Sequence, residues 1–297
     1  MTARPNAAAT DTPPRDDTAP PIPVLPLALG WRPRGHKPGA HAAAGDGGDG
    51  RFHSLAPLLA RPDPRRIDIR ASIRDPFEAV HVRTFAPRRA VTVTALVDLS
   101  GSMGCAGLAG AVARLVATCA ASAIAGGDAF SLIAADAAPR PDLFIPASRR
   151  RGLAREVLHR LTHAPRAGRG ATGLLAATEQ IPRARGIVVL VSDFLMPQTE
   201  LRALLDALHR HDVIPVVARS AAAEGALPRF GLIDLVDAET GARRLVFMRP
   251  GLRARWQAQA QARGRALDTL FASHGLAPFS LTDRFDPDAL LDFLLHR

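Results

Sequence analysis

Two short segments without polar alternation constrain the fold most. Residues 91–98 (VTVTALVD) are β-branched and apolar on both faces, and residues 186–191 (GIVVLV) contain no polar side chain. A strand with such a sequence is stable where helices cover both faces of its sheet, which is the situation in parallel α/β sheets. We therefore predict that both strands are buried and that residues 186–191 are central in the sheet.

The rest of the chain alternates between helical and strand patterns. Apolar residues at helical spacing predict helices at residues 104–125, 149–162, 172–180, 199–210, 253–273 and 286–295. Short apolar runs predict strands at residues 128–134, 143–145, 213–218 and 278–281, and a hairpin at residues 232–237 and 243–248. This alternation predicts a doubly wound, mostly parallel α/β sheet with helices on both faces and a small flanking β/α extension.

Small oxygen-bearing side chains follow the predicted strands where these end. In open α/β sheets, ligands bind at the carboxyl ends of strands, where the strand order reverses. Carboxylate and hydroxyl oxygens suit a hard cation such as Mg²⁺, with Mn²⁺ and Ca²⁺ as alternatives. Gly101 leaves room for a turn that points the two neighbouring hydroxyls to one side. Five residues are therefore candidates for one metal site: Asp98, Ser100, Ser102, Thr172 and Asp193.

Other roles for these residues stay open from the sequence. Residues 98–102 have a structural alternative as a turn that caps the next helix, and Thr172 can be a plain N-cap. A phosphatase of the haloacid-dehalogenase type needs a second carboxylate where this chain has Ser100. A serine hydrolase needs Gly-x-Ser-x-Gly, and neither Ser100 nor Ser102 fits this pattern. A P-loop needs a lysine in Gly-x₄-Gly-Lys-Ser/Thr, and the only lysine, Lys37, does not lie in such a pattern. We expect no enzyme activity, and a Mg-dependent hydrolase is kept as the weaker alternative.

The candidate residues resemble the metal-ion-dependent adhesion site of von Willebrand factor A domains. The matching segments, within about residues 91–218, are DLSGSM, GATGL and VLVSDF. The resemblance implies that Ser100, Ser102 and Thr172 touch the metal, while Asp98 and Asp193 act largely through water. It also implies that one coordination position stays open for an acidic residue of a partner protein.

A second resemblance narrows the family. Residues 61–72 (RPDPRRIDIRAS) are similar to the Gly-Asp-Asp-Pro-Arg-x-Ile-Asp-Trp-x-x-Ser signature of the bacterial proteins of domain of unknown function 58. The hairpin sequence LVDAETG is also typical of that family, whereas Ile69 replaces its tryptophan and Arg61-Pro62 replaces its Gly-Asp. The resemblance implies an adaptor that works with a MoxR-type AAA+ ATPase in the maturation or remodelling of a client enzyme.

Four regions follow from these observations. Residues 1–50, rich in Pro, Gly and Ala, are predicted to be disordered, and residues 51–90 to form a family-specific extension. Residues 91–220 form the expected von Willebrand factor A-like metal-binding domain. Residues 221–297 supply a hairpin and helices that pack on the same domain.

Composition narrows the partners and the compartment. The net charge of +10 comes from arginines scattered in pairs and triplets, and the chain has no tyrosine, so nucleic-acid binding is the alternative and not the main hypothesis. The longest apolar stretch, residues 106–125, contains Arg114, which argues against a membrane span. Cys105 and Cys119 are expected to be reduced thiols. We expect a cytoplasmic protein that binds other proteins through a divalent metal.

Overall fold

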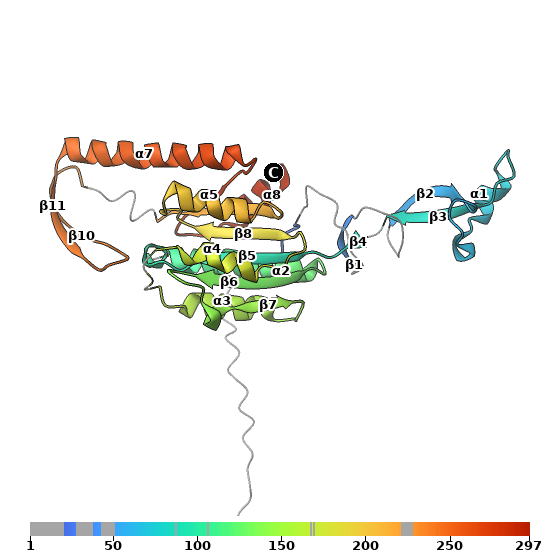
Figure 1. Cartoon of the computed structure of the whole chain (residues 1–297), viewed down its shortest axis with the longest axis horizontal. Helices are drawn as coiled ribbons and strands as arrows, with labels where there is room; N and C mark the ends of the chain where they lie inside the picture. Colours follow the sequence, from blue (N-terminus) through green and yellow to red (C-terminus); the bar gives the residue numbers. More distant parts are fainter. Residues whose placement is uncertain are drawn as a thin grey trace, which may run out of the picture.

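A six-stranded, mostly parallel sheet forms the centre of the molecule, with the strand order β12-β9-β8-β5-β6-β7 (Figure 1). The computed structural model describes residues 21–27, 38–42, 51–86, 88–105, 107–166, 168, 170–220 and 228–297. The strands of the sheet are β5 (Thr92–Asp98), β6 (Ala129–Ala135), β7 (Ile145–Ser148), β8 (Ile187–Ser192), β9 (Asp212–Ala218) and β12 (Phe279–Leu281). Neighbouring strands are parallel except β6 and β7, which are antiparallel. The prediction of a mostly parallel α/β sheet is confirmed.

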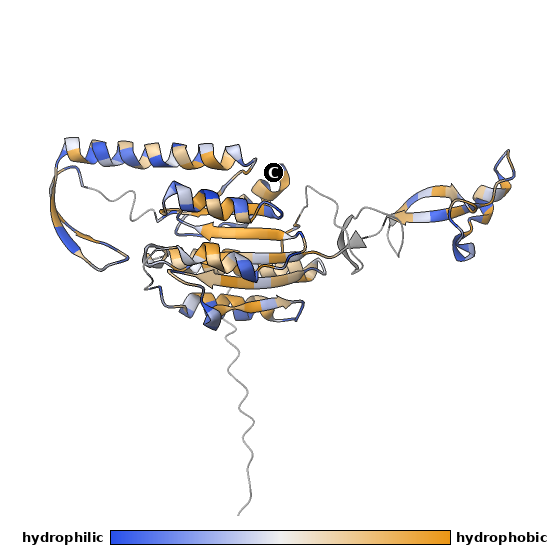
Figure 2. Ribbon diagram, viewed as in Figure 1, coloured by the Kyte–Doolittle hydropathy of each residue, from blue (hydrophilic) through white to orange (hydrophobic). Residues whose placement is uncertain are grey.

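The two strands predicted to be covered on both faces lie inside this sheet. β5 pairs with β6 on one side and with β8 on the other. Every residue of β8 is buried, and Figure 2 colours this strand as hydrophobic throughout. β9, which carries Pro215, lies beside the edge strand β12, near an edge as predicted. Because the chain leaves β5 towards β6 and later crosses to β8 on the other side, the strand order reverses at the carboxyl end of β5.

Helices cover both faces of the sheet. They are α2 (Leu108–Ala125), α3 (Leu153–His163), α4 (Gly173–Ala177), α5 (Gln198–Ala207), α7 (Pro250–Ser273) and α8 (Pro287–His296). One buried core joins Val93, Ala95 and Val97 of β5 to α2, α3 and α8. The other joins Leu96 of β5 to α4, α5 and the last turns of α7. Alternate side chains of β5 thus enter different cores, as its two-sided apolar sequence requires.

The helices nearest the candidate site are shorter than the sequence predicts. Residues 101–104 form a 3₁₀-helix, η2 (Gly101–Gly104), and α2 begins only after Gly107, whose φ of 88° is left-handed. Cys105 therefore precedes α2, whereas Cys119 lies within it, and both are free. α4 ends at Ala177 and is followed by the 3₁₀-helix η4 (Thr178–Gln180). A further 3₁₀-helix, η3 (Pro141–Leu143), precedes β7.

α2 is a core helix. By length and composition it could cross a membrane, since its mean hydropathy is 1.7 over 18 residues. However, 67% of this stretch is buried inside the molecule, against the sheet and α3. The polar Arg114 stays exposed, while its neighbours Ala113 and Leu115 are buried. The hydropathy of α2 is therefore explained by its place in the core.

A small N-terminal lobe lies apart from the sheet, at the right of Figure 1. It contains β2 (Arg51–Pro57), η1 (Pro64–Arg66), α1 (Ile69–Ile73) and β3 (His81–Ala86), with β2 and β3 paired antiparallel. A second short antiparallel pair is formed by β1 (Pro38–Ala42) and β4 (Arg88–Arg89). Figure 1 shows this pair between the lobe and the sheet. The lobe lies where the sequence predicts a flanking extension.

A hairpin lies on the opposite side of the sheet, at the left of Figure 1. Its strands β10 (Gly231–Val236) and β11 (Arg243–Met248) are antiparallel, as predicted, and lead directly into α7. The final helix, α8, also begins as predicted, because Asp286 accepts hydrogen bonds from Asp288 N (2.9 Å) and Ala289 N (3.4 Å).

The prediction of disorder over residues 1–50 is wrong for residues 21–27. The backbone N–H of Leu25 donates to Ser122 Oγ of α2 at 2.8 Å, and the Leu25 side chain is buried. Ile22 and Leu27 pack against the same core. Apart from residues 21–27 and β1, the N-terminal fifty residues lie outside the described part of the chain, so the prediction is not tested there.

Candidate functional site

Asp98 is the last residue of β5, and both of its carboxylate oxygens are engaged. Oδ1 accepts a hydrogen bond from Ser100 N at 2.8 Å, and Oδ2 accepts one from Ser192 Oγ at 2.6 Å. Asp98 has no exposed surface. The carboxylate therefore ties the end of β5 to the end of β8 and to the loop that follows β5.

Burial raises the pKa of Asp98 from its ordinary value of 3.8 to about 6. The hydrogen bonds from Ser192 and Ser100 oppose this rise, and the negative charge of Asp193 adds to it. Asp98 and Asp193 thus lie close enough to repel each other. A cation beside both carboxylates would offset the desolvation of Asp98 and this repulsion, which is what a divalent metal supplies.

The hydroxyls of Ser100 and Ser102 converge. Their Oγ atoms lie 3.1 Å apart, so the prediction that both turn to one side of the loop is confirmed. Ser100 is buried and Ser102 is half-buried. Ser100 stands at the N-cap of η2 but makes no side-chain capping bond. The capping alternative therefore does not account for this hydroxyl.

Thr172 lies just before α4 and is exposed. It stands at the N-cap position of α4, as the alternative predicts, but its hydroxyl donates to the carbonyl of Ala137 at 3.2 Å and makes no side-chain capping bond. The loop that carries it is held against the serine loop, because Gly101 N donates to Gly168 O at 3.0 Å. This contact holds Gly168, four residues before Thr172, against the serine loop; within the described residues the Thr172 hydroxyl is hydrogen-bonded to Ala137 O and not to the two serines or the two aspartates.

Asp193 follows β8 and is half-buried. Its Oδ1 accepts a hydrogen bond from Leu195 N at 3.1 Å. The next residue, Phe194, is buried and has a φ of 53°, an uncommon conformation for a residue with a side chain. Its ring makes an edge-to-face contact with Phe271 of α7 at 5.2 Å between centroids. Packing against α7 therefore fixes the backbone that presents Asp193.

Sequence reasoning missed Ser192. This side chain is buried, donates to Asp98 and accepts a hydrogen bond from Phe194 N at 3.0 Å. A signal was present in the strand pairing, since Val97 lies opposite Val191 and the following residues, Asp98 and Ser192, are therefore neighbours. Ser192 positions the Asp98 carboxylate and is not itself directed at the edge of the sheet.

The donor set fits a hard cation and not a soft one. Within the described residues, no three His, Cys, Asp or Glu side chains gather as a metal-binding group. The candidate set differs from such a group because it combines two carboxylates with three hydroxyls. Oxygen donors of this kind suit Mg²⁺, Mn²⁺ or Ca²⁺, with water filling the remaining positions. Metal binding at these five residues stays a prediction.

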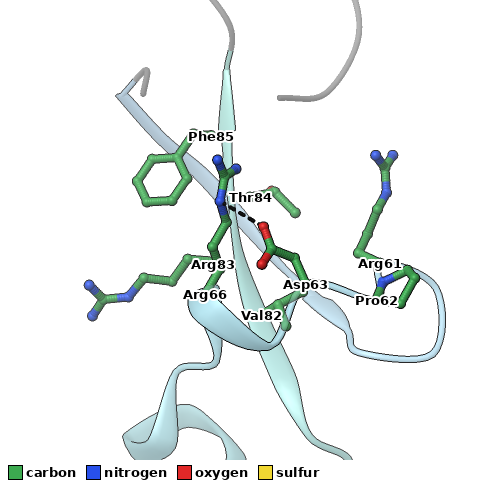
Figure 3. A pocket seen from close by; sticks show the side chains of 8 residues that line it. All are labelled: Arg61, Pro62, Asp63, Arg66, Val82, Arg83, Thr84 and Phe85. Atoms are coloured by element: carbon green, nitrogen blue, oxygen red, sulfur yellow. Dashed lines mark ion pairs between the residues drawn. The ribbon is translucent and has the colours of Figure 1, made fainter. Parts of the chain in front are cut away.

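A separate cavity of about 220 Å³ lies in the N-terminal lobe, far from the strand ends (Figure 3). Three arginines line it, and acidic side chains of the lobe pair with Arg66 and Arg83. Arg66 Nε pairs with Asp63 Oδ2 at 3.1 Å and its guanidinium lies 5.3 Å from the Phe85 ring, and Arg83 Nε pairs with Asp68 Oδ2 at 2.7 Å. These contacts hold together the segment that resembles the family signature, and we assign no ligand to the cavity.

Comparison with known proteins decides the family. The sequence matches the family described as "Protein of unknown function DUF58" over residues 62–266, which is more than half of the chain. The chain belongs to the DUF58 family. The match includes the candidate site, the hairpin and most of α7.

Relatives of this DUF58 chain are found in several bacteria. A Paracoccus denitrificans protein described as "Uncharacterized protein in moxR 3'region" is 41% identical over 101 residues, which is 34% of this chain and 96% of that protein. Uncharacterized proteins of Mycobacterium tuberculosis and Mycobacterium bovis are 31% identical over 241 residues, covering 78% of this chain and 74% of each relative.

The similarity of the chain to solved structures is weak. The pilus adhesin SpaC from Lactobacillus rhamnosus GG aligns with a TM-score of 0.29 and 16% identity, over 35% of this chain and 15% of the adhesin. A variant of the PilB minor pilin from Streptococcus sanguinis aligns with a TM-score of 0.33 and 10% identity, over 73% of this chain and 64% of the pilin. Similarity this weak carries no argument about this DUF58 chain.

Proposed function

We propose that this DUF58 chain is a non-catalytic, cytoplasmic adaptor that holds a partner protein through one divalent metal, Mg²⁺ in the cell. In this proposal its sheet is of the von Willebrand factor A type. Ser100, Ser102 and Thr172 bind the metal directly, and Asp98 and Asp193 bind it through water. An acidic residue of the partner completes the set.

One observation carries the proposal. Asp98, the two serine hydroxyls and Asp193 meet where the strand order reverses, and Asp98 is a fully buried carboxylate near a second negative charge. A buried acid with a raised pKa beside another acid is costly to the fold and is typical of functional sites. Asp98 is fully buried, Asp193 is half-buried and Thr172 is exposed, so in this proposal the metal lies near the surface, where a partner can reach it.

The proposed partner is a MoxR-type AAA+ ATPase. This part rests on the Paracoccus relative, whose description places it in a moxR 3' region. The chain has no lysine except Lys37, so it lacks the lysine of a P-loop and any ATP hydrolysis belongs to the partner. The pair would act on a client enzyme or complex during its maturation or remodelling.

Metal binding is tested first, by Mn²⁺ titration of the pure protein with electron paramagnetic resonance. We expect one site in the wild type and at least about tenfold weaker binding in Ser100→Ala/Ser102→Ala, since loss of groups around a metal costs 10- to 100-fold in affinity. The matched control is Thr162→Ala/Thr269→Ala, which removes two exposed hydroxyls that bond only to their own helices. Equal binding by all three proteins would show that the metal, if bound, lies elsewhere.

Partner binding is tested second, with a purified MoxR-type ATPase and the same variants at constant Mg²⁺. The variants carry this comparison because EDTA would also strip Mg²⁺ from the nucleotide of the ATPase. We expect capture by the wild type and the control variant, and none by Ser100→Ala/Ser102→Ala. Capture that ignores the serines and falls steeply with salt would instead indicate binding through the basic surface.

A further inference from the structure

The turn of the β10–β11 hairpin lies on the loop between the two candidate serines. A Cβ atom added to Gly101 would lie 2.1 Å from the carbonyl oxygen of Ala238 and 3.2 Å from the Cα of Glu239. Figure 1 shows the same approach, with the hairpin turn reaching towards the carboxyl ends of the central strands. The φ of Gly101 is not left-handed, so the glycine is required by this contact and not by its backbone conformation.

The turn itself is well formed. Asp237 N donates to Ala242 O at 2.9 Å, and Gly241 N donates to Asp237 O at 2.8 Å. The Asp237 carboxylate is used inside the turn, where its Oδ1 accepts from Glu239 N (2.9 Å) and Thr240 N (3.3 Å). The remaining acid of the turn is Glu239.

Glu239 is half-buried, although the residues on either side of it, Ala238 and Thr240, are exposed. Of these three residues, the glutamate is thus the one that its surroundings cover most. Its Cα lies next to Gly101, and consecutive Cα atoms are only about 3.8 Å apart, so the carboxylate is within a side chain's reach of Ser100 and Ser102.

We propose that Glu239 is an intramolecular ligand of the metal and occupies the position that an acidic residue of the partner takes. This inference rests on the metal site proposed above. In this structure the Glu239 carboxylate does not form a three-acid group with Asp98 and Asp193, so it rotates about its side-chain bonds when the metal binds. The negative charges of Asp98 and Asp193 repel a third carboxylate. The Glu239 carboxylate is therefore stable beside them only when the cation is present.

The consequence is competition. A group on a short tether has an effective concentration in the millimolar range, so a partner's acid must displace the hairpin turn before it reaches the metal. The hairpin is followed directly by α7, whose Phe271 packs on Phe194 beside Asp193. The segment from the hairpin turn to α7 therefore contacts the site twice, first through the turn and then through Phe271. Displacement of the turn breaks the first of these contacts.

The first test is Mn²⁺ titration of the full-length protein. We expect Glu239→Gln to bind Mn²⁺ about tenfold more weakly than the wild type, the low end of what loss of a group around a metal costs. Glu179→Gln, an exposed glutamate on η4, is the matched control and should bind like the wild type. If Ser100→Ala/Ser102→Ala loses the metal but Glu239→Gln does not, Glu239 is no ligand and the proposed metal site still stands. If the wild type binds no Mn²⁺, both proposals are overturned.

A second variant separates the carboxylate from the fold. Gly101→Ala keeps every oxygen ligand but places a methyl group against the Ala238 carbonyl, so it should push the turn away and weaken Mn²⁺ binding as much as Glu239→Gln. Combining the two should add no further loss, because both remove the same interaction. Gly110→Ala, where the added methyl meets open space, is the control. Hydrogen exchange at residues 237–242 should rise in Gly101→Ala alone. Independent, additive losses would overturn the proposal.

Discussion

The buried charge of Asp98 makes a prediction about stability that does not require a partner. In metal-free protein, Asp98→Asn removes a carboxylate whose ionised form is disfavoured by burial. Raising the pKa from 3.8 to about 6 corresponds to about 3 kcal/mol, at about 1.4 kcal/mol per pH unit. The amide can still accept from Ser100 N and donate to Ser192 Oγ. After about 1 kcal/mol is allowed for poorer hydrogen bonding, we expect the variant to be about 2 kcal/mol more stable above pH 7.

The stability difference between Asp98→Asn and wild type depends on pH. Because the folded-state pKa of Asp98 is raised, the folded chain holds its proton more tightly than the unfolded chain does. The penalty is therefore absent below about pH 4, grows between pH 4 and 6, and is complete above pH 6. The stability of Asp98→Asn relative to wild type should follow the same course, from about 1 kcal/mol lower below about pH 4, where only the poorer hydrogen bonding remains, to about 2 kcal/mol higher at pH 7.5.

Urea denaturation in EDTA at several pH values measures this difference. Asp292→Asn, an exposed aspartate on α8, is the control and should show little change. Added Mg²⁺ should narrow the difference, because a metal at one hundred times its Kd stabilises the wild type by about 2.7 kcal/mol and a variant with at least tenfold weaker affinity by about 1.4 kcal/mol or less. An Asp98→Asn protein that is less stable than wild type at pH 7.5 in EDTA, or a difference independent of pH, would refute the reasoning.

Three further predictions concern the frame around the site. Asp286→Ala removes the N-cap of α8 and should lower the free energy of unfolding by about 1 kcal/mol in urea denaturation, whereas Asp288→Ala should lower it less. Burial raises the pKa of Cys119 to about 12, so at pH 8 a thiol reagent should titrate Cys105 alone in the native protein; two fast thiols would contradict this. Phe194→Ala deletes a buried ring and should cost about 3–5 kcal/mol by the same denaturation assay, and a loss below about 1 kcal/mol would show that the contact with α7 is dispensable.

The sheet could be predicted because the residue types in each strand indicate how deeply that strand is buried. Residues 187–191 of β8 carry only apolar side chains, and both the burial and the interior position of the strand follow from that. Helix starts were harder, because α2 has no side-chain cap and begins after a left-handed Gly107 that looks like any other glycine in the sequence. Residues 21–27 were missed since their composition matches the surrounding segment, while the partner of Leu25, Ser122, is 97 positions away.

The site was predicted in part for a similar reason. The convergence of Ser100 with Ser102 follows from local spacing, and the approach of Asp98 to Asp193 follows from the parallel pairing of β5 with β8. Ser192 needed the register of β5 against β8, which periodicity alone does not supply. Gly101 and Ala238 lie far apart in the sequence, and no local pattern predicts the contact between them.

The burial of α2 also decides how the protein can be divided. Leu108–Ala125 is apolar except for Arg114, Thr118 and Ser122, and it is shielded by the sheet and by α3. A fragment that ends before β8, whether made by premature termination or by design, lacks part of this cover, and one that ends before α3 lacks more of it. An exposed 18-residue apolar helix inserts into bilayers or aggregates. The smallest soluble part of the chain must therefore extend past α3 and β8, and truncations within that span should be recovered with membranes or in inclusion bodies.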